Sequence, residues 1–257
     1  MPLIPEKLRR RKADGSLTLV EHLEELRTRL IIAIAAIGVG AIAGWFLFGP
    51  VMTLLRDPYC AALNNIPKSS RPPTGCNFIV TGVLDPIVIK LKIVVFLGLF
   101  IALPIVLYQL WAFIVPGLTE RERRMAIPFV FSSTALFALG GLLAYWVMPK
   151  GLGFLLGFAG SGITPFVTAD KFVTFVLLLT LAFGLSFEFP IVLIFLTAVG
   201  ILSSARLREW RRGAIVSIAI FAAVITPSND PYTMLAMGIP MYLFYEASIL
   251  VARLMKK

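Results

Sequence analysis

Residues 178–196 read LLTLAFGLSFEFPIVLIFL, a run whose only charged residue is Glu188, two positions before Pro190. A helix of about 20 residues crosses the roughly 30 Å of hydrocarbon in a bilayer. A carboxylate near the centre of such a helix costs about 2.5–3.5 kcal/mol on insertion scales, and residues of this kind mark functional sites. The stretch therefore predicts a membrane-spanning helix with a functional carboxylate inside it.

The composition of the whole chain agrees with a membrane protein. Hydrophobic residues make up 58% of the 257 positions and charged residues only 15%. A soluble domain would carry about 45–50% apolar and about 25% charged residues. We expect a single integral membrane domain over residues 1–257, of which residues 1–17 form a polar cytoplasmic tail.

Apolar runs at helix length predict the transmembrane segments. They lie at 30–49, 87–115, 126–148, 172–201, 214–226 and 233–252. The last two runs flank the turn sequence PSNDPY, and the fifth, about 13 residues long, reaches only about 20 Å. We expect an all-α fold with six transmembrane helices, the last two short, and a long loop at 50–86.

Basic residues in the connecting segments predict the orientation. They concentrate before the first run, between the second and third, between the fourth and fifth, and after the sixth. The positive-inside rule then places both termini in the cytoplasm. Because topology accounts for the net charge of +10, we expect no nucleic acid as a partner.

The chain has two cysteines, Cys60 and Cys76, both in the segment expected outside the cytoplasm. Thiols oxidise in that environment, so a disulfide is expected, with two unrelated thiols as the alternative. A metal site is disfavoured, because that side holds no histidine and no second cysteine pair. No catalytic residue is expected either. His22 is the only histidine, so the two histidines of HExxH are not available, and the chain contains no GxSxG motif with a histidine partner.

Acidic residues instead gather at two cytoplasmic helix ends. In TLVEHLEELRTRL, residues 18–30, Thr18 and Glu21 fit a capping box, and Glu25 and Arg29 have the spacing of an i,i+4 pair. In VPGLTERERRMAIP, residues 115–128, Glu122 follows Thr119 at capping-box spacing. Both stretches also have a purely structural explanation. The first would be a solvated charged face, and the second would combine a helix cap at Glu122 with arginines that set the topology.

Four motifs, in this order along the chain, resemble one family. HLEELRTRL, YQLWAFIVPGLTERERR, AFGLSFEFP and ITPSNDPYTMLAMGIPMYLFYE are similar to the TatC family, the membrane receptor subunit of the twin-arginine protein translocase. The resemblance runs from about Thr18 to Arg253. It implies a receptor that binds the twin-arginine signal peptides of folded precursor proteins at its cytoplasmic face and nucleates the complex that moves them across the membrane.

The resemblance also implies partners and a location. The expected partners are signal peptides, single-span TatA/TatB-type subunits, other TatC copies and the lipid bilayer. Transport would be driven by the proton-motive force without a cofactor. Since no transit peptide precedes the match, the expected location is the plasma membrane of a prokaryote.

Residue roles carry over from the family motifs. The resemblance places signal-peptide binding on Glu25, Arg27, Phe113, Pro116, Leu118, Glu122, Arg123 and Arg124. It places an intramembrane polar site at Glu188 beside Pro190, and two extracytoplasmic positions at Pro86 and Asp230. The two cysteines are not part of the general family pattern.

Two alternatives remain open from the residues. Glu188 would serve a polar partner helix or cavity, or would be a protonated carboxyl bonded to a neighbouring helix. The chain as a whole would be the translocase receptor, or an ion-coupled secondary transporter of a small solute that uses intramembrane carboxylates. Transporters of that class often show paired repeats, whereas runs one to three and four to six differ in length.

Overall fold

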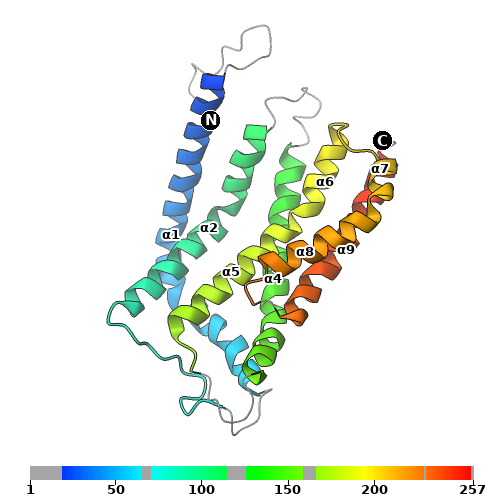
Figure 1. Ribbon diagram of the computed structural model, residues 1–257. Helices are drawn as coiled ribbons and strands as arrows, with labels where there is room; N and C mark the ends of the chain where they lie inside the picture. Colours follow the sequence, from blue (N-terminus) through cyan, green and yellow to red (C-terminus); the bar gives the residue numbers. More distant parts are fainter. Residues whose placement is uncertain (1–18, 65–70, 115–125, 159–165, 229, 256–257) are drawn as a thin grey trace.

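A computed structural model describes residues 19–64, 71–114, 126–158, 166–228 and 230–255. Within these ranges the fold is all-α, apart from one isolated bridge between Ile79 and Thr168. The helices, in chain order, are α1 (Leu19–Asn64), α2 (Asp85–Ile114), α4 (Ala126–Gly157), α5 (Ala169–Phe187), α6 (Phe189–Ala198), α7 (Ser204–Glu209), α8 (Arg211–Ile225) and α9 (Pro231–Leu254) (Figure 1).

Five helical stretches of the described chain are long and apolar enough to cross a membrane. They are α1, α2, α4, the α5–α6 pair and α9. The fifth predicted span corresponds to α8, whose 15 residues reach about 22 Å. The prediction of a short sixth helix is wrong, since α9 has 24 residues. Its apolar run underestimates its length because Asp230 and Pro231 start the helix before that run begins.

The first helix is much longer than its apolar run. The loop expected at 50–86 is helical as far as Asn64, because α1 continues through Pro50 and Pro58. Each proline removes a backbone donor. Packing outweighs that cost, since Leu55, Tyr59, Ala62 and Leu63 on this extension are all buried in the main core. In Figure 1 the light-blue end of α1 runs across the lower end of the assembly toward α4.

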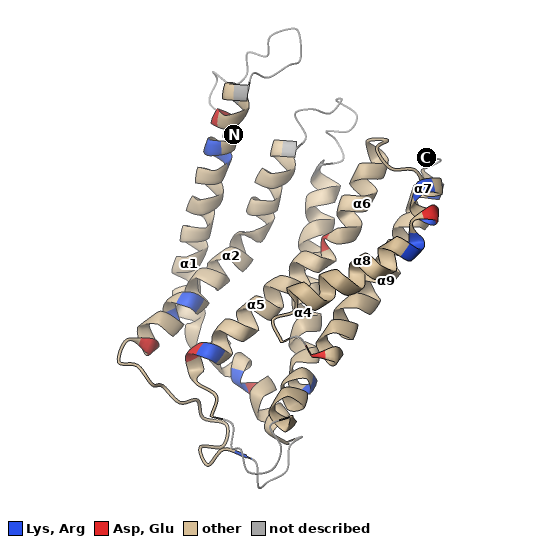
Figure 2. Ribbon diagram, in the orientation of Figure 1, with Lys and Arg blue, Asp and Glu red and all other residues tan. Residues whose placement is uncertain are grey.

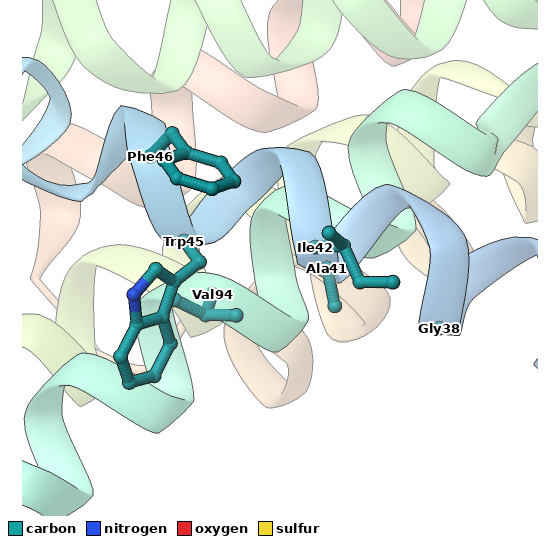
Figure 3. Close-up of a pocket in the computed structure, with 6 residues that line it drawn as sticks. All are labelled: Gly38, Ala41, Ile42, Trp45, Phe46 and Val94. Atoms are coloured by element: carbon teal, nitrogen blue, oxygen red, sulfur yellow. The ribbon is translucent and has the colours of Figure 1, made fainter.

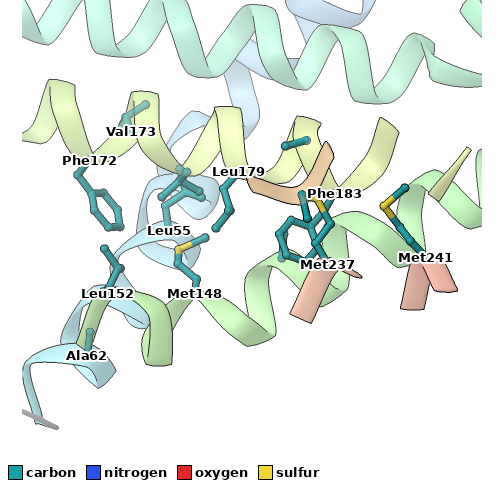
Figure 4. Packing of buried hydrophobic residues seen from close by; sticks show 14 of the residues in the cluster. Leu55, Ala62, Met148, Leu152, Phe172, Val173, Leu179, Phe183, Met237 and Met241 are labelled. Carbon is teal, nitrogen blue, oxygen red and sulfur yellow. The ribbon is translucent and has the colours of Figure 1, made fainter. Parts of the chain in front are cut away.

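The main hydrophobic core surrounds α5. Phe172, Val173, Val176, Leu179 and Phe183 are buried along this helix. Figure 4 shows several of them facing side chains of α4 and α9, among them Met148 and Met237. A helix that is apolar on all sides is expected to lie buried among other helices, as α5 does here.

Glycine pairs allow two pairs of helices to approach closely. A Cβ added at Gly40 of α1 would lie 2.6 Å from the carbonyl oxygen of Gly98 on α2. A Cβ at Gly140 of α4 would lie 2.6 Å from the carbonyl oxygen of Phe183 on α5. Lipid tails are as apolar as the helix surfaces, so the hydrophobic effect does not drive helices together within the bilayer. Close packing at small residues favours their association instead.

The two ends of the assembly differ from its middle. Figure 2 shows charged residues mainly toward the helix ends, with long uncharged stretches between them. The first described turn of α1 and the last turn of α9 lie at the same end (Figure 1). Large apolar side chains are exposed between the ends, including Phe46 at 79% and Phe131 at 76%. A band of exposed apolar side chains between two charged ends is typical of a lipid-facing surface.

Candidate functional site

A polar cluster joins the start of α1 to the end of α2. The Arg29 guanidinium donates to Glu25 Oε1 from Nε at 3.0 Å and from Nη2 at 2.5 Å, and from Nη1 to Gln109 Oε1 at 3.3 Å. One turn further out, the rings of His22 and Phe113 stack with centroids 4.4 Å apart. We call these five residues the α1–α2 polar cluster.

Glu25 is held in place and partly sheltered in this cluster. Its side chain is 15% exposed and that of Arg29 is 18% exposed. Both bonds from Arg29 end on Oε1, and within the described residues Oε2 accepts no hydrogen bond. A carboxylate with one oxygen fixed and the other accessible can accept a further charge-assisted hydrogen bond.

The structure brings together only some of the predicted binding residues. Glu25 and Phe113 lie in the same cluster, although they belong to different helices. Arg27 is exposed on the same turn of α1 as Glu25. The other predicted binding residues lie outside the described residues: Pro116, Leu118, Glu122, Arg123 and Arg124.

Gln109 is a cluster residue that the sequence reasoning missed. It accepts from Arg29 and so connects the glutamate on α1 to the frame of α2. The sequence does place Gln109 near Phe113, because residues four positions apart share one face of a helix. The sequence does not show, however, that this neutral amide bonds Arg29, which lies 80 residues away along the chain.

Glu188 lies where α5 ends and α6 begins. Its backbone N–H donates to the Leu185 carbonyl at 3.1 Å, and its own carbonyl accepts from Val192 at 3.1 Å. Pro190 occupies the first turn of α6 and lacks the N–H that would donate to the carbonyl of Ser186. The helix is therefore interrupted beside Pro190, between α5 and α6.

The Glu188 carboxyl is only partly satisfied by its neighbours. The Ser133 hydroxyl lies beside it. Ser133 in turn accepts from the indole of Trp111 at 3.3 Å. Glu188 Oε1 is buried and has no hydrogen-bond partner within the described part of the chain. An unpaired buried acceptor costs about 1–3 kcal/mol, so this position retains an unused capacity for a polar partner.

The Trp111 end of this polar chain lies in an apolar cluster. Ile191 of α6, Phe137 of α4 and Leu107 of α2 are buried in the cluster that also contains Trp111. Phe195 of α6 packs edge-on against Trp111, with ring centroids 5.0 Å apart. The polar chain Trp111–Ser133–Glu188 therefore crosses three helical elements within an otherwise apolar region.

Asp230 is a buried helix cap in this structure. Its carboxylate accepts from the Thr233 backbone N–H at 2.8 Å and from the Thr233 hydroxyl at 2.6 Å, which closes the first turn of α9. Asp230 is 2% exposed. Gly151 of α4 packs against Thr233, because a Cβ there would lie 2.7 Å from the Thr233 methyl carbon.

Pro86 is the second residue of α2, next to Asp85, whose carboxylate bonds the turn that precedes the helix. Asp85 accepts from the backbone N–H of Gly82 at 2.7 Å and of Thr81 at 3.2 Å. Pro86 itself lines a cavity between α1 and α2. The two predicted extracytoplasmic residues thus belong to two different helix starts.

Cys60 and Cys76 are joined by a disulfide with a Cα–Cα distance of 5.2 Å. The bridge ties the end of α1 to the segment before α2. Next to it the Tyr59, Phe78 and Phe172 rings form a trio, with Phe78 4.9 Å from Tyr59 and 4.7 Å from Phe172 between centroids. The bridge and the aromatic trio fix this segment against α5.

Long apolar helices, polar helix ends and a buried carboxylate together define a polytopic α-helical membrane protein. The model of the family described as Sec-independent protein translocase protein (TatC) matches residues 21–240. The chain therefore belongs to the TatC family.

Relatives with the same description cover nearly all of the chain. The Sec-independent protein translocase protein TatC of Frankia casuarinae is 42% identical over 245 residues, which are 93% of this chain and 66% of the relative. That of Aquifex aeolicus is 38% identical over 239 residues, which are 92% of this chain and 95% of the relative. The chain thus spans slightly less than two thirds of the Frankia protein and almost all of the Aquifex protein.

Solved structures agree with the family. A crystal structure of the twin-arginine translocase receptor TatC in DDM is 37% identical, with a TM-score of 0.72, and covers 90% of this chain and 99% of that one. A second structure described as the same receptor has the same identity and TM-score and covers 92% of this chain.

Proposed function

We propose that the protein is the receptor subunit of a twin-arginine translocase. In this proposal it binds the signal peptides of folded precursors at the α1–α2 polar cluster and nucleates the complex that moves them across the membrane. Family membership supports the translocase. The observation that carries peptide binding is Glu25, which Arg29 holds through one oxygen while the other accepts no hydrogen bond from the described residues.

Two carboxylates suit two adjacent arginines. A guanidinium presents a planar fork of donors that a carboxylate accepts bidentately, and an ammonium cannot reproduce that geometry. Glu25 would take one arginine and Glu122 the other. Arg27, Arg123 and Arg124 would line the same surface, and the exposed edge of the His22–Phe113 stack would contact apolar residues of the peptide.

Glu188 would serve a later step. Its buried oxygen lacks a partner within the described residues. We infer that a polar group on a transmembrane helix of a TatA/TatB-type subunit hydrogen-bonds this carboxyl during assembly. Other TatC copies would complete the complex, and the proton-motive force would drive transport without a cofactor.

The proposed topology has six crossings in the plasma membrane of a prokaryote, with both termini in the cytoplasm. It counts α8 as the fifth crossing, in a bilayer thinned around its 15 residues. An even number of crossings accords with the first turn of α1 and the last turn of α9 lying at one end of the assembly. The basic loops accord with that end facing the cytoplasm.

A binding experiment tests the proposal. The purified protein should bind a signal peptide with adjacent arginines and lose most of that affinity when both arginines become lysines, because lysine keeps the charge but not the fork. Equal affinity for the arginine and lysine peptides would contradict recognition by carboxylates. An ion-coupled transporter, which the family match does not favour, would instead accumulate a small solute and ignore the peptide.

A further inference from the structure

A groove runs between α1 and α2 from the middle of the assembly toward the end opposite the polar cluster. Its apolar part has a volume of about 310 Å³ and is lined by Gly38, Ala41, Ile42, Trp45 and Phe46 of α1 and by Val94 of α2. Figure 3 shows Ile42, Ala41 and Gly38 following Trp45 along the same helix. Ile42, Trp45 and Phe46 are exposed by 65%, 52% and 79%, as expected of a surface that faces acyl chains.

A second hollow, of about 570 Å³, continues the groove toward the start of α2. Phe48, Met52 and Ile89 contribute apolar walls, and Arg56 and Lys90 contribute two cationic groups. Trp45, Phe48, Met52 and Arg56 recur at intervals of three and four residues, so they lie along one face of α1. Pro86, Lys90 and Val94 do the same on α2.

Lys90 joins the two hollows. Its ammonium lies 3.6 Å from the centre of the Trp45 ring and 5.6 Å from that of Phe48. Trp45 lines the apolar part, while Lys90 and Phe48 line the charged part. An apolar trough therefore leads directly to a cationic cavity.

The two cations have no carboxylate partner in the described part of the chain. The three ion pairs there are Arg29–Glu25, Lys92–Asp170 and Arg211–Glu246. The nearby Asp85 accepts backbone hydrogen bonds from Thr81 and Gly82. Asp170 accepts from Lys92 at 2.6 Å. The cavity thus carries two positive charges at a membrane boundary, where anionic headgroups are the available counter-ions.

We propose that this groove binds one anionic phospholipid, with its phosphate in the cavity lined by Arg56 and Lys90 and an acyl chain along the trough from Trp45 to Gly38. Two cations beside apolar walls match the chemistry of such a lipid, and a zwitterionic lipid adds an ammonium that both cations repel. The lipid would hold α1 and α2 together at the end that carries Pro86.

The test compares two lipids that differ only in headgroup. The purified full-length protein is delipidated, and dioleoyl phosphatidylglycerol or dioleoyl phosphatidylcholine is added. Native mass spectrometry counts the bound lipid, and thermal unfolding measures the stabilisation. We expect retention and stabilisation with phosphatidylglycerol at concentrations where phosphatidylcholine gives neither. Equal behaviour of the two lipids would overturn the proposal.

Substitution of each cation tests whether the lipid binds at this cavity. Arg56→Gln and Lys90→Gln should each weaken phosphatidylglycerol binding roughly fivefold, the effect of removing one interfacial cation. Lys150→Gln is the matched control, since Lys150 also lies over a tryptophan, 5.1 Å from the centre of Trp146, but outside this groove. An equal loss in Lys150→Gln would overturn the assignment, because general surface charge would then explain the preference.

Two further arms separate a lipid from a free anion. Ala41→Trp fills the trough and leaves both cations in place, so it should reduce retention of phosphatidylglycerol. Glycerol phosphate, which has the anion without the chain, should neither stabilise the protein nor displace the lipid at equal concentration. Stabilisation by glycerol phosphate equal to that by the lipid would mean an anion site only and would overturn the lipid proposal.

Discussion

Arg29 fixes Glu25 from the next turn of the same helix and is itself bonded to Gln109 on α2. The pair has the i,i+4 spacing that the sequence predicts, and the structure confirms that pair. The bonding pattern adds what spacing cannot give, since both donors of Arg29 end on one carboxylate oxygen. The other oxygen accepts no hydrogen bond from the described residues.

Removing the carboxylate should weaken signal-peptide binding without unfolding the protein. Glu25→Ala or Glu122→Ala is expected to reduce the affinity for a twin-arginine peptide by about 1–3 kcal/mol, the range for a sheltered charge-assisted hydrogen bond. Fluorescence titration of the purified variants measures the loss. Glu24→Ala is the control, because Glu24 is exposed next to Glu25 and belongs to no ion pair within the described residues. Wild-type affinity in both single variants and in the double variant would remove the recognition site.

Arg29 should act by positioning Glu25. Arg29→Lys keeps the charge but cannot bond Glu25 and Gln109 from one planar group, so we expect a loss of affinity of about 1 kcal/mol. Gln109→Leu should weaken binding in the same direction, and Arg29→Lys should add little to it, since both changes break one network. Additive losses in the double variant would show that the two residues act separately.

The Gly40–Gly98 contact should be sensitive to a single methyl group. A Cβ at Gly98 would lie 2.6 Å from the carbonyl oxygen of Ile37 and 2.8 Å from the amide nitrogen of Ala41. Because neither backbone atom can rotate away, Gly98→Ala should destabilise the protein by about 1–3 kcal/mol. Gly49→Ala is the control, since a Cβ there meets nothing within 4 Å and alanine favours the helix by about 1 kcal/mol. Thermal unfolding in detergent compares the two, and equal melting temperatures would contradict the close contact.

The sequence predicted the all-α membrane fold because apolar runs of helix length have no other stable form in lipid. It misplaced the end of α1, since Pro50 and Pro58 resemble loop residues until the buried side chains around them are known. It also left α9 too short, because Asp230 and Pro231 start the helix before its apolar run begins.

Motif resemblance located candidate residues but not their bonds. Nothing in the spacing of Trp111, Ser133 and Glu188 indicates that they form one polar chain, since they lie on separate helical elements. The capping role of Asp230 was within reach of the sequence, because aspartate is a preferred N-cap and Pro231 follows it at the first helical position. The position of Gln109 on the same face of α2 as Phe113 follows from their spacing, but its bond to Arg29 follows only from the packing of α2 against α1.

The disulfide can be tested by labelling. A thiol-reactive reagent should modify neither Cys60 nor Cys76 in the oxidised protein and both after reduction. Closing a loop of about 15 residues is expected to stabilise the fold by about 3 kcal/mol in the chain-entropy model. The Cys60→Ala/Cys76→Ala double variant should therefore unfold at a lower temperature and should not respond to reductant. Ready labelling of the wild type without reductant would contradict the pairing.

Glu188 should separate transport from binding. If its carboxyl served only to bond Ser133, Glu188→Gln would be nearly neutral, because the amide keeps the shape and an acceptor oxygen. Glu188→Leu would then stabilise the fold, since it removes the buried oxygen that lacks a partner within the described residues.

If the carboxyl instead bonds a partner helix, both variants should fold and bind signal peptide with wild-type affinity. Export of a folded reporter in cells should nevertheless fall, most in the Leu variant, which has no polar atom left to bond the partner. Ser186→Ala is a control for local packing, because the Ser186 hydroxyl donates to the Ala182 carbonyl of its own helix at 2.6 Å. Full export by Glu188→Leu would leave the carboxyl with no part in transport.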